Sequence, residues 1–195
     1  MGKIKVVTVS GNLGARSRTR ALIDAVVEEV EARVSIHRTD IVIGELAPDL
    51  GALTDPKAAP PRVADALAAI VGADLLVVGT PVYKGSYTGL FKHLIDFIDP
   101  NALGGVPVVL TATGGSPRHA LVIEHQLRPL FGFFLAHTVP TGVFAQDSDF
   151  TDYRLTSPDI AARAARAADE AVRIAALGRL ATSTASLATA SLAAA

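Results

Sequence analysis

Four short apolar runs punctuate the chain and predict buried strands of a parallel sheet. Each run is rich in Val, Leu or Thr and is bounded by Gly or Pro, as expected of strands that are covered on both faces. The runs lie at residues 4–10, 74–80, 106–112 and approximately 137–144. A fifth segment, residues 34–43, alternates apolar and polar positions, which indicates a strand at the edge of the sheet.

Helical periodicity fills the segments between these runs. Leu22, Val26 and Val30 recur every four residues, and acidic residues between them are available for the solvent side of the expected helix. Further helices are expected at residues 57–71, 87–98, 117–134 and 157–177.

Five strands that alternate with five helices predict a three-layer α/β fold, because parallel neighbours require a crossover that is normally helical and right-handed. We expect a flavodoxin-like arrangement, in which a five-stranded parallel sheet has the strand order 2-1-3-4-5. In such sheets the ligand lies beyond the carboxyl ends of the strands, between the first strand and the third. This rule selects three loops, at residues 10–18, 80–86 and 111–117, all rich in Gly, Ser, Thr and Pro.

The composition narrows the class of ligand. With 18 basic and 19 acidic residues the formal net charge is −1, so no overall charge attracts the chain to nucleic acid or to an anionic membrane. The lack of cysteine removes disulfides, thiolate nucleophiles and iron–sulfur sites. The histidines show no metal-ligand spacing, so we expect no metal site. A small molecule is the expected ligand.

Half of the 195 residues are apolar, which suits one domain with a substantial core. We expect this domain to span residues 1–178. The following residues 179–195 form a low-complexity tail of Ala, Ser, Thr and Leu that we expect to be frayed helix or disorder. No apolar run reaches the length of a membrane span, and the first residues lack a signal-peptide pattern. The expected location is therefore the cytoplasm.

The first loop has the composition of a phosphate site. A helix N-terminus offers unpaired N–H groups and partial positive charge. Ser17 and Thr19 add hydroxyl donors there, and Arg16 or Arg18 can supply a full counter-charge. Plain helix capping with solvated arginines is the alternative. The loop has neither GxGxxG nor GxxxxGK[ST], which leaves a terminal monophosphate as the expected group.

The second and third loops can hold a flat ring. Pro81 and Gly85 bracket a turn, so Val82, Tyr83 and Lys84 can present side chain and main chain to it. A half-buried surface tyrosine and a solvated lysine are the alternatives. The third loop can offer consecutive backbone N–H groups to carbonyl oxygens, as at the pyrimidine edge of a flavin. Its candidate residues are Thr113, Gly114, Gly115 and Ser116.

Three segments together resemble the NAD(P)H-dependent FMN reductases, and their sulfonate-utilisation branch in particular. They are residues 80–96, 112–116 and 142–148, and the resemblance runs from Ile4 to about Tyr153. It implies FMN phosphate in the first loop, the isoalloxazine against the other two, and a homodimer or homotetramer. Many family members carry a serine where this chain has Asn12, so Ser10 and Asn12 join the expected cofactor contacts.

The resemblance also selects His125. At the matching position the alkanesulfonate reductases insert a tyrosine that forms a π-bulge at a subunit interface, whereas the histidine resembles the methanesulfonate-type members. We expect His125 near the flavin as a catalytic candidate, and a histidine packed in an oligomer interface is the alternative. The run at residues 127–135 is apolar around most of its circumference, which predicts packing against a partner subunit.

The implied activity is hydride transfer from NADPH or NADH to FMN, with reduced FMN supplied to a flavin-dependent monooxygenase of sulfonate desulfonation. Donors near flavin N1 and O2 would stabilise the growing negative charge. The backbone N–H groups of residues 113–116 are the first candidates and Lys84 is the second. Two alternatives stay open, namely an FMN-retaining quinone or azo-dye reductase and a non-enzymatic electron carrier of flavodoxin type.

Overall fold

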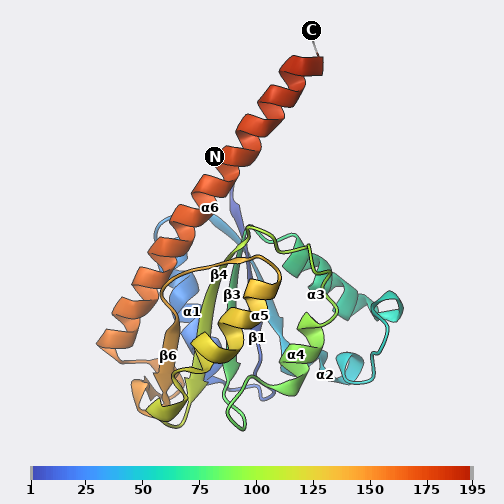
Figure 1. The fold of residues 1–195 in the computed structure, drawn as a ribbon. Coiled ribbons are helices and arrows are strands. Elements are labelled where there is room, and N and C mark those ends of the chain that lie inside the picture. Colours follow the sequence, from blue (N-terminus) through green and yellow to red (C-terminus); the bar gives the residue numbers. More distant parts are fainter. Residues whose placement is uncertain (1, 194–195) are drawn as a thin grey trace.

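A twisted parallel sheet runs through the middle of the fold, with helices on both faces (Figure 1). The computed structural model describes the backbone of residues 2–193 and the side chains of residues 2–178. The strands pair in the order β2-β1-β3-β4-β5, which confirms the expected flavodoxin-like order, and β6 extends the fifth position beside β4. The strands of this sheet are β1 (Ile4–Ser10), β2 (Ile36–Val42), β3 (Leu75–Pro81), β4 (Pro107–Gly114), β5 (His137–Thr138) and β6 (Val143–Gln146).

Burial along the strands follows their place in the sheet. The central strand β3 is buried from Leu75 through Thr80, whereas the edge strand β2 is only partly covered. One face of the sheet is covered by α1 and α6, and the other by α2, α3, α4 and α5. The α-helices are α1 (Arg18–Glu31), α2 (Ile43–Leu50), α3 (Pro61–Val71), α4 (Gly89–Ile95), α5 (Arg128–Phe133) and α6 (Pro158–Ala193).

Small side chains let α6 lie close to α1. Among the described side chains of α6, those that are fully buried are all alanines, each at most 4% exposed, opposite the apolar face of α1. These are Ala164, Ala167, Ala168, Ala171 and Ala175. The backbone of α6 stays helical to Ala193, beyond the expected end at residue 177, and extends past the sheet (Figure 1). No helix within residues 2–193 combines the length and apolar composition that crossing a membrane requires.

The structure also differs from the sequence expectation in the second strand, the fifth strand and the helix expected at residues 117–134. The edge strand ends at Val42, and Ile43 begins α2, which was not expected. The fifth strand is divided into β5 and β6 around Pro140, whose nitrogen cannot donate to a sheet. The helix expected at residues 117–134 forms three pieces. These are η2 (Pro117–His119), a π-helical turn η3 (Ile123–Leu127) and α5.

Three short elements lie between β6 and α6. A single helical turn, η4 (Asp147–Asp149), leads into an antiparallel hairpin of β7 (Phe150–Thr151) and β8 (Arg154–Leu155). The hairpin brings Tyr153, at its turn, back to the carboxyl end of the sheet, where the first loop begins α1.

Candidate functional site

The three expected loops converge on one cleft of about 330 Å³ beyond the carboxyl ends of β1, β3 and β4. This is the place that the switch in strand order selects for a ligand. Most of the residues expected to bind a cofactor line this cleft. They are Asn12, Arg16, Ser17, Arg18, Thr19, Pro81, Val82, Tyr83, Thr113, Gly114 and Gly115.

The first turn of α1 is arranged for an anion. Ser17 is the N-cap, and its hydroxyl oxygen accepts a hydrogen bond from the Arg20 N–H at 3.2 Å, so the hydroxyl proton stays available to a ligand. The first turn holds Arg18 and Arg20 and no acidic residue. Cations at the positive end of a helix are unfavourable unless an anion binds there. The cationic first turn therefore fits a phosphate group.

Buried polar side chains shape the floor of the first loop. Ser10 and Asn12 are 2% and 5% exposed, and the Ser10 hydroxyl donates to the Asn12 side-chain oxygen. The Asn12 amide in turn donates to the Gly14 carbonyl at 2.6 Å. Asn12 thus fixes the curve of the loop while facing the cleft, whereas Ser10 lies beneath it.

Two contacts bind the loops to one another. Thr19 and Thr113 share a buried hydroxyl–hydroxyl hydrogen bond of 2.6 Å, which joins the first loop to the third. The Val82 N–H donates to the Thr113 carbonyl at 2.8 Å, which keeps the second loop beside the third. Because these bonds are internal, the cleft has its shape before any ligand arrives.

The remaining expected residues do not line the cleft. Lys84 and Gly85 form the exposed tip of the second loop, both with positive φ. Ser116 caps η2 and accepts from the Arg118 N–H at 3.3 Å. His125 lies exposed within the π-helical turn, where its backbone N–H donates to the Leu121 carbonyl. The catalytic roles of Lys84 and His125 stay predictions.

Four residues line the cleft that the sequence did not single out. Leu13 and Gly14 belong to the first loop, and Asp147 follows β6. Asp147 forms an ion pair of 3.5 Å with Arg18. Tyr153 arrives from the hairpin and places its ring against Arg16 and Arg18. Asp147 was within reach of sequence reading, since residues 142–148 carry the resemblance, whereas Tyr153 belongs to no motif.

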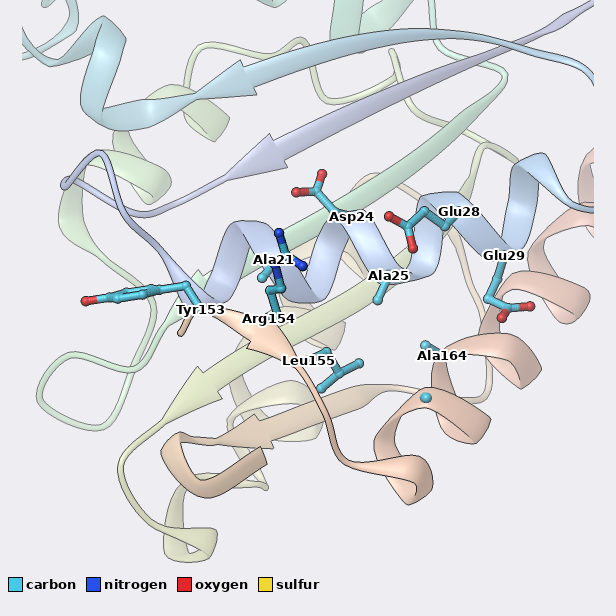
Figure 2. Close-up of a pocket in the computed structure, with 10 residues that line it drawn as sticks. Ala21, Asp24, Ala25, Glu28, Glu29, Tyr153, Arg154, Leu155 and Ala164 are labelled. Carbon is cyan, nitrogen blue, oxygen red and sulfur yellow. The ribbon is translucent and has the colours of Figure 1, made fainter. Parts of the chain in front are cut away.

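The other large cavities suit a phosphorylated ligand less well. A cavity of about 470 Å³ lies between α1, the hairpin and α6, and the carboxylates of Asp24, Glu28 and Glu29 line it (Figure 2). Carboxylates repel a phosphate. A cavity of about 700 Å³, lined by His137 and Leu177, adjoins the starts of β4 and β5. In the described part of the chain no group of three or more His, Asp or Glu could hold a metal ion.

The strand order defines a flavodoxin-like fold, and the cationic, glycine-lined cleft lies where folds of this class bind their ligand. The family model of NADPH-dependent FMN reductases matches residues 4–151. The chain belongs to this family, as the motifs implied. It is therefore an oxidoreductase whose cofactors are FMN and NADH or NADPH.

Known relatives cover most of the chain. The NADH-dependent FMN reductase SfnF of Pseudomonas fluorescens is 49% identical over 168 residues, which are 86% of this chain and 90% of the relative. An FMN reductase (NADPH) of Pseudomonas aeruginosa is 48% identical over 86% of this chain and 90% of its own. An X-ray structure of an oxidoreductase from Corynebacterium diphtheriae matches with a TM-score of 0.80 and 37% identity, over 89% of this chain and 97% of that one.

Proposed function

We propose that the chain reduces FMN with NADH or NADPH in the cleft between the three loops and releases reduced FMN to a flavin-dependent monooxygenase of sulfonate desulfonation. The observation that carries this proposal is the cleft itself, where a cationic helix start faces a glycine-rich loop. The cleft is lined largely by exposed or half-exposed residues, including Tyr83, which is 52% exposed. An open cleft of this kind suits a flavin that leaves after reduction.

The first loop would hold the phosphate of FMN. Arg16 and Arg18 offer guanidinium donors, Ser17 offers its hydroxyl proton, and the start of α1 offers backbone N–H groups. Asn12 and Thr19 keep these groups in place through their hydrogen bonds to Gly14 and Thr113. The residues present therefore fit a terminal monophosphate.

The second and third loops would hold the ring system. When bound, FMN supplies an isoalloxazine that accepts hydride from the nicotinamide and carries negative charge afterwards. Pro81, Val82 and Tyr83 line the cleft on the side of the second loop, and Gly114 and Gly115 line it on the side of the third. Of the expected donors at residues 113–116, Thr113 and Gly114 lie within β4, whereas Gly115 and Ser116 follow it. The backbone N–H groups of Gly115 and Ser116 can donate where that charge grows, and Lys84 and His125 are further candidates.

Anaerobic mixing of the protein with FMN and each nicotinamide, followed by flavin absorbance, tests the reaction. We expect flavin absorbance to fall and the rate to saturate with added free FMN. Reduced flavin should then support turnover by an added sulfonate monooxygenase. If the protein reduced a quinone at a rate that did not depend on added FMN, the result would favour a reductase that retains its flavin. Tightly held FMN without oxidation of either nicotinamide would favour an electron carrier.

The phosphate assignment predicts a split between FMN and riboflavin. Replacing Arg16 and Ser17 by alanine removes a charged donor and a hydroxyl, which should weaken FMN roughly 10- to 100-fold. Riboflavin lacks the phosphate and should bind as before. Fluorescence titration of both flavins measures the split, with Arg62→Ala, an exposed arginine on α3 outside the cleft, as a control. Equal weakening of both flavins would remove the assignment.

We also infer that the chain works in the cytoplasm as a homodimer or homotetramer. The cytoplasm is where NADH and NADPH are regenerated. The C-terminal end of α5 supports association, because Phe133 and Leu135 are 67% and 77% exposed while their neighbours Phe131 and Phe134 are buried in the core. Exposed aromatic and aliphatic side chains of this kind are typical of subunit contacts.

A further inference from the structure

Tyr153 contacts both arginines of the proposed phosphate loop. The guanidinium carbons of Arg16 and Arg18 lie 4.4 Å and 5.1 Å from the centre of its ring. Both distances fall within the range of cation–π attraction. Figure 2 shows Tyr153 beside the N-terminal end of α1, whereas Glu28 and Glu29 lie on later turns of the same helix. The ring therefore stands between the acidic cavity and the cationic cleft.

The backbone at the hairpin turn has an uncommon conformation for a tyrosine. Asp152 and Tyr153 have φ values of 48° and 62°, which makes the two-residue turn left-handed at both positions. Such turns favour Gly, Asn or Asp, and a bulky residue there is an outlier. Core packing does not account for Tyr153, because it is 36% exposed. Strained positions of this kind often serve a functional site.

The charges around the ring leave Arg16 available to an anion. Arg18 forms an ion pair with Asp147 at 3.5 Å. Arg16 has no ion-pair partner among the residues whose side chains are described. An aromatic face attracts a guanidinium without neutralising it or occupying its N–H groups. A carboxylate in the same place would do both. Stacking thus restrains both cations and leaves the donors of Arg16 free, whereas Arg18 also pairs with Asp147.

We propose that Tyr153 is a positioning residue that orders Arg16 and Arg18 for the phosphate of FMN. The inference rests on the proposed function, since it takes the cleft to be the FMN site. Two neighbouring guanidiniums repel each other, and their long side chains lose conformational freedom when they bind an anion. The ring lowers both costs before the phosphate arrives, so its contribution is confined to phosphorylated flavin.

Titration of FMN and riboflavin into Tyr153 variants tests this role. Tyr153→Ala should weaken FMN roughly 5- to 10-fold, because two exposed cation–π contacts are lost, and should leave riboflavin unchanged. Tyr153→Phe keeps the ring and should bind FMN as the parent does. Tyr153→Gly relaxes the left-handed backbone and should match Tyr153→Ala, which separates loss of the stack from loss of folding.

Further readouts separate the possible outcomes. In an Arg16→Ala background, Tyr153→Ala should cost less than it does alone, because one stacked partner is already missing. Arg154→Ala, next in the hairpin and outside the cleft, is the matched control. Unchanged FMN binding by Tyr153→Ala, equal loss of both flavins, or failure of Tyr153→Phe to restore binding would each overturn the positioning role. Lack of FMN binding by the parent protein would instead overturn the proposed function.

Discussion

At the residue scale, Arg128 fastens α5 to the divided edge of the sheet. Its guanidinium donates to the Thr138 hydroxyl at 3.0 Å and to the carbonyls of Val139 and Pro140 at 2.9 Å and 3.2 Å. The same group donates to both carboxylate oxygens of Glu124. The hydrogen bond from Arg128 lowers the pKa of Glu124, and the carboxylate in turn raises the pKa of Arg128.

This ion pair predicts a pH dependence of stability. Because the pKa of Glu124 is lower in the folded chain, the pair stabilises the fold above the ordinary value of 4.5, and the effect is lost as pH falls through the lowered pKa. Glu124→Gln should cost about 0.5 kcal/mol near neutral pH, since the pair is half exposed, and nothing in strong acid. Urea unfolding across pH 3 to 7 would measure this, with exposed Glu28→Gln as a control. A constant difference at all pH values would contradict it.

From the sequence we could predict the site residues that lie at a helix start or in a loop after a strand. Arg16, Ser17 and Thr19 could be selected because the start of a helix has a local signature of hydroxyl and charge. Tyr153 could not, because its contact with Arg16 depends on where the hairpin returns in space. Lys84 was selected because it lies in the second loop, and His125 was selected through the resemblance. The structure places both outside the lining of the cleft.

At the element scale, α2 supports the first loop from outside. The Gly44 N–H donates to the Asn12 carbonyl at 3.0 Å, and a Cβ at Gly44 would lie 2.4 Å from the Leu13 carbonyl oxygen. Real Cβ atoms do not approach backbone this closely. The first turn of α2 therefore needs glycine so that the first loop can lie against it.

Gly44→Ala should displace the first loop and weaken FMN binding. Overpacking at this contact should also lower the free energy of unfolding by roughly 1 to 3 kcal/mol. Thermal unfolding and FMN titration would measure the two effects. Gly89→Ala, at the start of α4, meets nothing within 4 Å and should leave both unchanged. If the Gly44→Ala variant bound FMN with the affinity of the parent, FMN binding by the first loop would not depend on its contact with α2.

Elements with a continuous pattern were predicted more closely than those set by their neighbours. The apolar run at residues 4–10 predicted the bounds of β1 as the structure shows them, Ile4–Ser10. The start of α2 was missed because Ile43 continues the apolar alternation of β2. The two-residue strands β7 and β8 were beyond reach, because they carry too few residues to show a period. The π-helical turn η3 shows no period either, but it contains His125, the position that the resemblance matched to a π-bulge.

At the scale of the whole molecule, the exposed end of α5 predicts association between copies. Phe133→Ser with Leu135→Asn removes the two exposed apolar side chains, and asparagine tolerates the positive φ of residue 135. We expect this variant to sediment as a monomer at concentrations where the parent is a dimer or tetramer. Val71→Ser, which changes an exposed valine on α3, should not alter the oligomeric state. An unchanged sedimentation coefficient for the double variant would place the subunit contact elsewhere.

The two borders of the sheet constrain how copies of the chain can meet. On one border β2 carries His37, Arg38 and Asp40, and on the other β5 has only two residues before Pro140 interrupts the pairing. Charged side chains oppose strand pairing at β2, and the interruption at Pro140 shortens the row of backbone donors and acceptors at the other border. Strand-by-strand growth into fibres is thereby disfavoured, and stable contact between chains is left to helix surfaces.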